Sequence, residues 1–313
     1  MREERMMARR ILSVWFTRLA SERAQRMRPL AGPLGVSARH KGALRLACVN
    51  AEAAAAGLAP GMGLAQARAI CPGLATSPAD GPGEARFLRS LARWAGRYTP
   101  WVGEEPPDAL VLDITGCAHL FGGEAALVHD LEARAARAGL SVQTGLADTP
   151  AAARALARHA PGIAAPGQAA GALAGLPVAA LGLSAGAAAA LARLGVGQIG
   201  ALAALPRATL PARFGPEVLE RLDAALGARA EPIAPLAAPE RLAVRLRLPE
   251  PIGHSADVMA GLSRLLAPLC SRLEARGQGA RVLVLTLSRV DGAAQAVELR
   301  LATPMRSPAR IAP

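Results

Sequence analysis

A pair of glycines in the second half of the chain could bring backbone N–H groups to a phosphate. Gly195, Val196 and Gly197 stand between two alanine-rich segments that favour helices, the form of a helix-hairpin-helix. Glycines permit a tight hairpin, and free N–H groups near a helix N-terminus can hold a DNA phosphate without reading its sequence. An ordinary pair of helices joined by a glycine turn has the same pattern, and the motif alone does not choose between them.

A second candidate for phosphate binding is residues 241–248, where basic and apolar residues alternate. As a strand, this segment places Arg241, Arg245 and Arg247 on one face and its leucines and valine on the other. One face can then pack while the other meets phosphate. The predicted phosphate contacts are Arg245, Arg247 and Arg281, and such contacts give a salt-dependent affinity with little base preference.

The charge of the chain is concentrated at its two ends. The net charge is +12, with +8 in residues 1–45, −2 in residues 46–240 and +6 in residues 241–313. Lys41 is the only lysine, and the excess of arginine is typical of a GC-rich genome. Two basic ends around a neutral middle favour a polyanionic partner, nucleic acid above all.

Metal, secretory and membrane functions find little support in the sequence. Cys48, Cys71, Cys117 and Cys270 are far apart, and Cys117 with His119 lacks further ligands. The apolar run at residues 11–16 is too short for a secretory signal. Residues 160–192 are uncharged, but prolines and glycines interrupt them, so we expect no membrane span. We expect a cytoplasmic protein with reduced cysteines.

The elements that would position these residues follow from local patterns. Short apolar runs predict strands at residues 11–16, 110–115 and 141–147, and helical spacing predicts helices at 64–71, 87–98, 124–138 and 258–276. Residues 166–235 have helix and turn signals without a convincing strand. Asp291-Gly292 predicts a hairpin between strands at 281–290 and 294–301, the second of them an exposed edge.

Taken in order, these blocks resemble the Y-family (UmuC-like) DNA polymerases. Residues 50–72 are similar to the fingers of that family, residues 107–116 and 145–147 to its palm strands, the glycine hairpin to its thumb, and the arginine-faced segment to its little finger. The resemblance implies a multidomain α/β and α+β right-hand architecture. Its parts would be a palm (residues 1–30 and 75–165), fingers (31–74), a helical thumb (166–235) and an incomplete little finger (240–313).

The residues that hold metal in this family are mostly replaced. By resemblance, the first palm strand should carry Asp-x-Asp, where this chain has Trp15 and Thr17, and the second should carry Asp-Glu, where it has Asp108-Ala109. One carboxylate cannot hold two Mg²⁺ ions. Four further family positions for the triphosphate, the ribose or a lysine are occupied by Ala51, Ala54, Pro150 and Ala20. The resemblance is therefore to the non-catalytic subgroup of the bacterial damage-induced mutasome, with no catalytic residues, metal or cofactor.

The function implied by the resemblance is assembly on DNA. Its members hold template DNA during translesion synthesis in the SOS response, with an error-prone replicative polymerase alpha subunit and a RecA-like accessory protein as partners, near the nucleoid. The chain ends at Pro313 without the family's clamp-binding peptide, so we expect binding to the sliding clamp to be in doubt.

Two other interpretations stay open at this point. An active error-prone polymerase would need Mg²⁺ ligands from unexpected positions such as Glu104 or Glu105, which we expect in a solvated loop. A truncated product without function would neither fold nor bind DNA.

Overall fold

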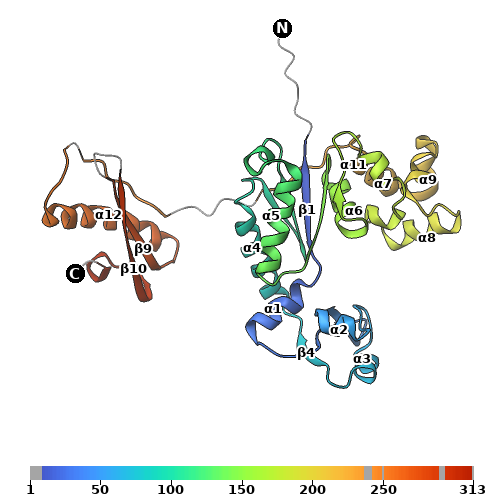
Figure 1. Ribbon diagram of the computed structural model, residues 1–313, viewed down its shortest axis with the longest axis horizontal. Helices are drawn as coiled ribbons and strands as arrows, with labels where there is room; N and C mark the ends of the chain where they lie inside the picture. The colour runs from blue at the N-terminus through green and yellow to red at the C-terminus, as the bar shows by residue number, and fades with distance from the viewer. Residues whose placement is uncertain (1–8, 236–241, 249, 289–292, 312–313) are drawn as a thin grey trace, which may run out of the picture. The chain divides into compact units, whose positions relative to one another are not determined.

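The computed structural model describes residues 9–235, 242–248, 250–288 and 293–311, and the chain divides into two compact units, residues 1–236 and 237–313. The larger unit is built on a five-stranded palm sheet of order β5-β6-β1-β7-β8 (Figure 1). β1 (Ile11–Phe16) runs antiparallel to β6 (Ala109–Asp113) and β7 (Val142–Ala147). β5 (Val102–Glu105) and β8 (Gly162–Ile163) form its edges.

β1 is buried on both faces, and this explains its continuous apolar run. Leu12, Val14 and Phe16 pack with helices α4 (Gly81–Ala95) and α5 (Glu124–Arg137). The alternate residues of β1 face the other way, where Ile11 packs against α6 (Pro150–His159). The side chain of Trp15 therefore points to the face that α6 covers. The 3₁₀ turn η1 (Ala118–Phe121) precedes α5.

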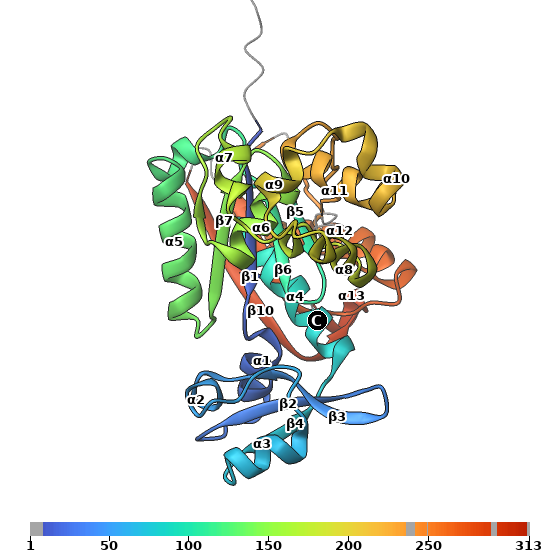
Figure 2. The same cartoon turned by 90° about the vertical axis from the view of Figure 1, so that its right-hand side faces the viewer.

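The fingers segment follows α1 (Leu19–Met27) and forms its own three-stranded sheet of order β3-β2-β4. It contains β2 (Leu34–His40), β3 (Ala43–Val49), α2 (Ala51–Ala55), α3 (Leu64–Ile70) and β4 (Ala75–Pro78). Figure 2 shows this sheet beyond the end of the palm, joined to it by α1. β4 pairs with β2, so the expected boundary after residue 74 cuts through this sheet.

Residues 166–235, the expected thumb, form short helices and no named strand, in agreement with their helix and turn signals. They are α7 (Ala169–Ala174), η2 (Val178–Leu181), α8 (Ala185–Arg193), α9 (Ile199–Ala203), η3 (Arg207–Thr209), α10 (Leu210–Phe214) and α11 (Pro216–Leu226). Their apolar faces share one core with α6 and with Ile11 and Val111 of the palm sheet. Of the helices that the structure describes, none is long and apolar enough to cross a membrane.

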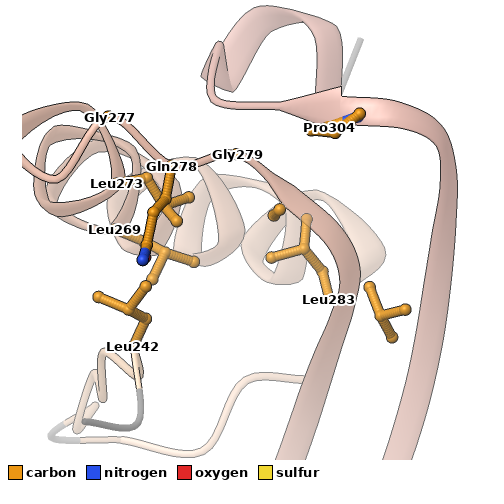
Figure 3. A pocket seen from close by; sticks show the side chains of 10 residues that line it. Leu242, Leu269, Leu273, Gly277, Gln278, Gly279, Leu283 and Pro304 are labelled. Atoms are coloured by element: carbon orange, nitrogen blue, oxygen red, sulfur yellow. The ribbon is translucent and has the colours of Figure 1, made fainter. Parts of the chain in front are cut away.

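The smaller unit has a long helix and a two-stranded antiparallel sheet. It contains α12 (Ser255–Ala275), β9 (Ala280–Ser288), β10 (Ala294–Met305) and α13 (Pro308–Ile311). Among its described residues, Leu266, Cys270 and Ile311 form a small buried core cluster. An open, largely apolar pocket beside α12 is lined by Leu242, Leu269, Leu273 and Leu283 (Figure 3). None of the residues that line this pocket has a titratable side chain. The predicted turn at Asp291-Gly292 lies outside the described residues.

The strand predicted at residues 241–248 is wrong for the described part of that segment. Residues 242–248 have no strand partner among the described residues, although their exposure alternates as in a strand. The segment lies against α12 instead, where Arg272 donates a hydrogen bond to the carbonyl of Ala243 (3.1 Å). Alternation of polar and apolar residues favours an extended backbone, but a β-strand also requires a neighbouring strand that pairs with its N–H and C=O groups.

The single tyrosine gives the palm a pH-dependent contribution to stability. Burial, followed by the hydrogen bond that Tyr98 donates to Asp130 (2.8 Å), raises the pKa of Tyr98 to about 12. A folded-state pKa above the unfolded value of about 10 means that this stability is complete below pH 10 and lost as the pH rises toward 12.

We therefore expect the free energy of unfolding to fall more steeply between pH 10 and 12 in the wild type than in Tyr98→Phe. Because Tyr98 is the only tyrosine, the ultraviolet absorbance of tyrosinate measures its titration directly. Equal slopes for both proteins would contradict the assignment.

Candidate functional site

Three side chains from separate elements meet at the end of β1. Trp15 comes from β1, Asp108 from the turn before β6, and Arg158 from the last turn of α6. The Trp15 Nε1–H donates to Asp108 Oδ2 (3.0 Å), and Arg158 Nη2 contacts Asp108 Oδ1 (2.9 Å). The guanidinium Cζ lies 4.8 Å from the Trp15 ring centroid, a cation–π arrangement. We call this the Trp15–Asp108–Arg158 cluster.

The strand register explains the arrangement of this cluster. Trp15 lies opposite Ala109 in the β1–β6 ladder, and the Phe16 N–H donates to the carbonyl of Asp108 (2.9 Å). Asp108, the residue before β6 begins, is thereby fixed within reach of the indole. Ala109 is fully buried, and the Thr17 N–H and hydroxyl are directed at the carbonyl of Ser141 (3.1 and 3.4 Å). The four predicted positions Trp15, Thr17, Asp108 and Ala109 therefore lie at one end of the sheet, with a single carboxylate among them.

A second arginine of α6 neutralises the next carboxylates. Arg154 contacts both Glu105 (2.8 Å) and Glu231 (2.8 Å). Burial lowers the pKa of Arg154, but its bonds to the two glutamates outweigh this and raise it. Glu104 pairs with Arg89 (3.1 Å). The expectation that Glu104 and Glu105 lie in a solvated loop is wrong, because both belong to β5 and pair with β6.

This geometry leaves no group of metal ligands. Both oxygens of Asp108 already accept hydrogen bonds, one of them from the positively charged guanidinium of Arg158. Among the residues that the structure describes, no three His, Cys, Asp or Glu side chains come together as a metal site, and this includes Cys117 with His119.

Sequence analysis missed Arg154 and Arg158. They are four residues apart after Thr149-Pro150, which caps and begins α6, so they lie on one face of that helix. The spacing could have shown that they act together. It could not have shown their partners, because Asp108 is 50 residues away in the sequence.

The glycine hairpin forms where the sequence predicts it, between α8 and α9, with Gly195 at φ +72°. The expectation that its N–H groups are free is wrong. The N–H groups of Gly195, Val196 and Gly197 donate to Ala192, Leu191 and Gly195 (3.0, 3.1 and 3.1 Å). A tight turn satisfies its own amides, whereas the first N–H groups of a helix have no partner within it. The donors available near the hairpin are therefore those of Gly200 and Ala201 in the first turn of α9.

The three predicted phosphate-binding arginines all lie in the smaller unit. Arg245 and Arg247 are exposed in the extended segment beside α12. Arg281, at the start of β9, is also exposed and donates to the carbonyl of Ala302 (3.3 Å). Each of these guanidinium groups keeps donors free for a phosphate. Contact with DNA at these positions stays a prediction.

The comparisons with known proteins agree with this architecture. Residues 16–158 match the family model described as "impB/mucB/samB family". Protein ImuB of Caulobacter vibrioides (strain NA1000 / CB15N) is 43% identical over 258 residues, which cover 82% of this chain and 56% of ImuB. ImuB of strain ATCC 19089 / CIP 103742 matches equally. The chain thus spans about half the length of these curated relatives.

Several solved structures have a similar fold. DinB from Sulfolobus solfataricus has a TM-score of 0.60 at 17% identity, covering 97% of this chain and 91% of the other. The insertion ternary complex of Dbh DNA polymerase has a TM-score of 0.61 at 18% identity, covering 95% and 89%. At this identity the likeness concerns the fold alone. Through its impB/mucB/samB domain, its identity with ImuB and this fold, the chain belongs to the Y family of DNA polymerases and their relatives.

Proposed function

We propose that this chain is a non-catalytic Y-family relative that binds DNA as a scaffold in translesion synthesis, damage-induced mutagenesis and DNA repair. The observation that carries the proposal is the Trp15–Asp108–Arg158 cluster. Nucleotidyl transfer in a polymerase fold requires two Mg²⁺ ions held by several carboxylates. Here the residues do not fit two such ions, because Asp108 accepts hydrogen bonds from an arginine and a tryptophan.

The charge pairs around the cluster support the same conclusion. Glu105 is bound to Arg154 and Glu104 to Arg89, so neither is free to replace a missing ligand. Removing an arginine from such a pair would leave a partly buried carboxylate unpaired, which is costly. In this proposal, the carboxylates of Asp108, Glu104 and Glu105 form ion pairs with arginines instead of binding metal ions.

The proposed role on DNA uses the thumb and the smaller unit. The N–H groups of Gly200 and Ala201 would hold one phosphate, and Arg245, Arg247 and Arg281 would hold others. By likeness to ImuB, an error-prone replicative polymerase alpha subunit and a RecA-like accessory protein are the proposed partners at the damaged nucleoid. Binding to the sliding clamp is not part of the proposal.

Two assays on the full chain test the absence of catalysis. In primer extension with Mg²⁺ or Mn²⁺, we expect no templated incorporation by the wild type and none by Asp108→Ala. Incorporation that disappears in Asp108→Ala would overturn the proposal in favour of an active polymerase. Circular dichroism of both proteins keeps a failure to fold distinct from a lack of activity.

DNA binding is tested by fluorescence anisotropy over a range of salt concentrations. We expect Arg245→Gln/Arg247→Gln to make the slope of log K against log salt shallower by about 1.8, or about 0.9 for each lost phosphate contact. Arg137→Gln on α5 serves as the matched control for lost charge and should leave the slope nearly unchanged. A folded chain that does not bind DNA would refute the scaffold role.

A further inference from the structure

The tip of the β2–β3 hairpin is an exposed basic feature of the larger unit. β4 pairs with β2 only from Leu34 to Ser37, so residues 38–44 extend beyond the sheet as a two-stranded ribbon. Arg45 stands at its base, where its backbone bridges Gly63 and its guanidinium donates one hydrogen bond to the carbonyl of Gly61 (2.8 Å) and keeps its other donors for a phosphate. Every residue from Arg39 to Arg45 is exposed. We call residues 38–45 the fingers ribbon; Figure 2 shows β2 and β3 extending past β4.

The fingers ribbon carries positive charge on both of its faces and at its end. Ala38 pairs with Arg45 and Arg39 with Leu44 in the ladder, so the two arginines point to opposite faces. Lys41 stands in the two-residue turn between the strands. Glu52 is the only acidic residue between positions 29 and 79. Among the described residues, none forms an ion pair with Arg39 or Lys41.

The turn itself is built against local preference. Lys41 has φ +48° and Gly42 φ +84°, and of the described residues other than glycine, Lys41 alone has a positive φ. A two-residue hairpin of this type favours Asn-Gly, and a lysine in its first position is strained. The only lysine of the chain therefore occupies a place where asparagine would be more stable, which indicates a function for its charge.

We propose that the fingers ribbon enters a groove of duplex DNA, with Arg39 and Arg45 on the phosphates of the two walls and Lys41 at the tip. A groove presents rows of phosphates on both sides, and the major groove, about 12 Å wide, admits a two-stranded β-ribbon. A single strand or an acidic protein surface presents its charge to one side. Cations on opposite faces of a narrow ribbon therefore match the duplex best.

The unique lysine allows a direct footprint of this contact. The rate of Lys41 acetylation in the full chain is measured by mass spectrometry without DNA, with a duplex and with a single strand of equal length. We expect the duplex to slow the reaction several-fold and the single strand to slow it much less. An unchanged rate with bound duplex, or equal protection by the single strand or by polyglutamate, would overturn the proposal.

A second measurement separates the contact from the fold. Lys41→Asn should raise the urea midpoint, because Asn-Gly suits the turn, and yet lower the affinity for duplex DNA. Arg39→Gln/Lys41→Asn/Arg45→Gln should make the salt slope shallower by about 2.7, or about 0.9 for each of three phosphates. Arg68→Gln on α3 is the matched control from the same segment. Unchanged affinity and slope in the triple variant would contradict the proposal.

The fingers ribbon lies outside the surfaces of the proposed function, so the two can fail separately. If the wild type binds duplex DNA and Arg245→Gln/Arg247→Gln weakens it while the ribbon variants do not, the ribbon proposal alone is wrong. If the folded wild type does not bind DNA at all, both are wrong.

Discussion

Replacing Arg10 by methionine is expected to lower the free energy of unfolding by about 3–5 kcal/mol, the usual cost of removing one partner from a buried ion pair. The Arg10 side chain is 7% exposed and contacts both oxygens of Glu124 (2.7 Å each) and one of Asp148 (2.8 Å). It also donates to the carbonyl of Ala164 (2.7 Å). The variant leaves two carboxylates and a carbonyl without their donor, and methionine fills the space but cannot replace the bonds.

Urea denaturation followed by tryptophan fluorescence suits this test. Trp15, Trp94 and Trp101 are the only tryptophans, and all belong to the larger unit, so unfolding of the smaller unit does not disturb the signal. Arg229→Met is the matched control, because the Arg229–Glu220 pair is more than half exposed on both sides and such pairs contribute about 0–1 kcal/mol. A loss below about 1 kcal/mol in Arg10→Met would show that the buried network is not stabilising.

Arg10 and Arg158 lie at opposite ends of the palm sheet and have the same role. At each end a guanidinium holds a carboxylate from another element: Glu124 and Asp148 at one end, Asp108 at the other. Arg9 with Asp113 and Arg154 with Glu105 extend the pattern. At both ends of this sheet, arginines thus neutralise carboxylates that come from other elements. The sequence bias toward arginine thus has a structural use.

The buried strands of the palm could be predicted from the sequence because each is marked by its own residues. Ile11–Phe16 and Ala109–Asp113 are apolar runs, and burial on both faces requires such runs. β2 and β3 were missed because Pro29, Gly35 and Gly42 interrupt the segment. Their strands exist through pairing with each other and with β4, which no local pattern reveals.

The site could be predicted only in part, for a similar reason. Trp15 and Asp108 could be predicted from the family motif, because Trp15 replaces one of its aspartates and Asp108 retains another. The partner that neutralises Asp108 comes from a helix whose position depends on tertiary packing. Likewise, the glycines of the hairpin predict a turn, but the direction of each N–H group follows from the closed geometry of that turn.

Gly145→Ala is expected to destabilise the larger unit by about 3 kcal/mol, near the upper end for overpacking a core. A Cβ at Gly145 in β7 would lie 2.3 Å from the Ala153 carbonyl oxygen and 2.4 Å from the Ala157 backbone nitrogen. Both are backbone atoms of α6, so a side-chain rotation cannot relieve the overlap, and the helix must move away from the sheet.

The same displacement would reach the candidate site, because α6 carries Arg154 and Arg158. We therefore expect Gly145→Ala to change the fluorescence of folded Trp15 as the guanidinium leaves its ring, together with the lower urea midpoint. Gly186→Ala in α8 is the matched control: nothing lies within 4 Å of its added Cβ, and alanine in a helix is favoured over glycine by up to about 1 kcal/mol. Loss of stability in both variants would point to a general intolerance of alanine, whereas loss in Gly145→Ala alone would assign it to the contact between α6 and β7. That contact, rather than any property of Asp108 itself, would then set where Arg158 meets the carboxylate of Asp108.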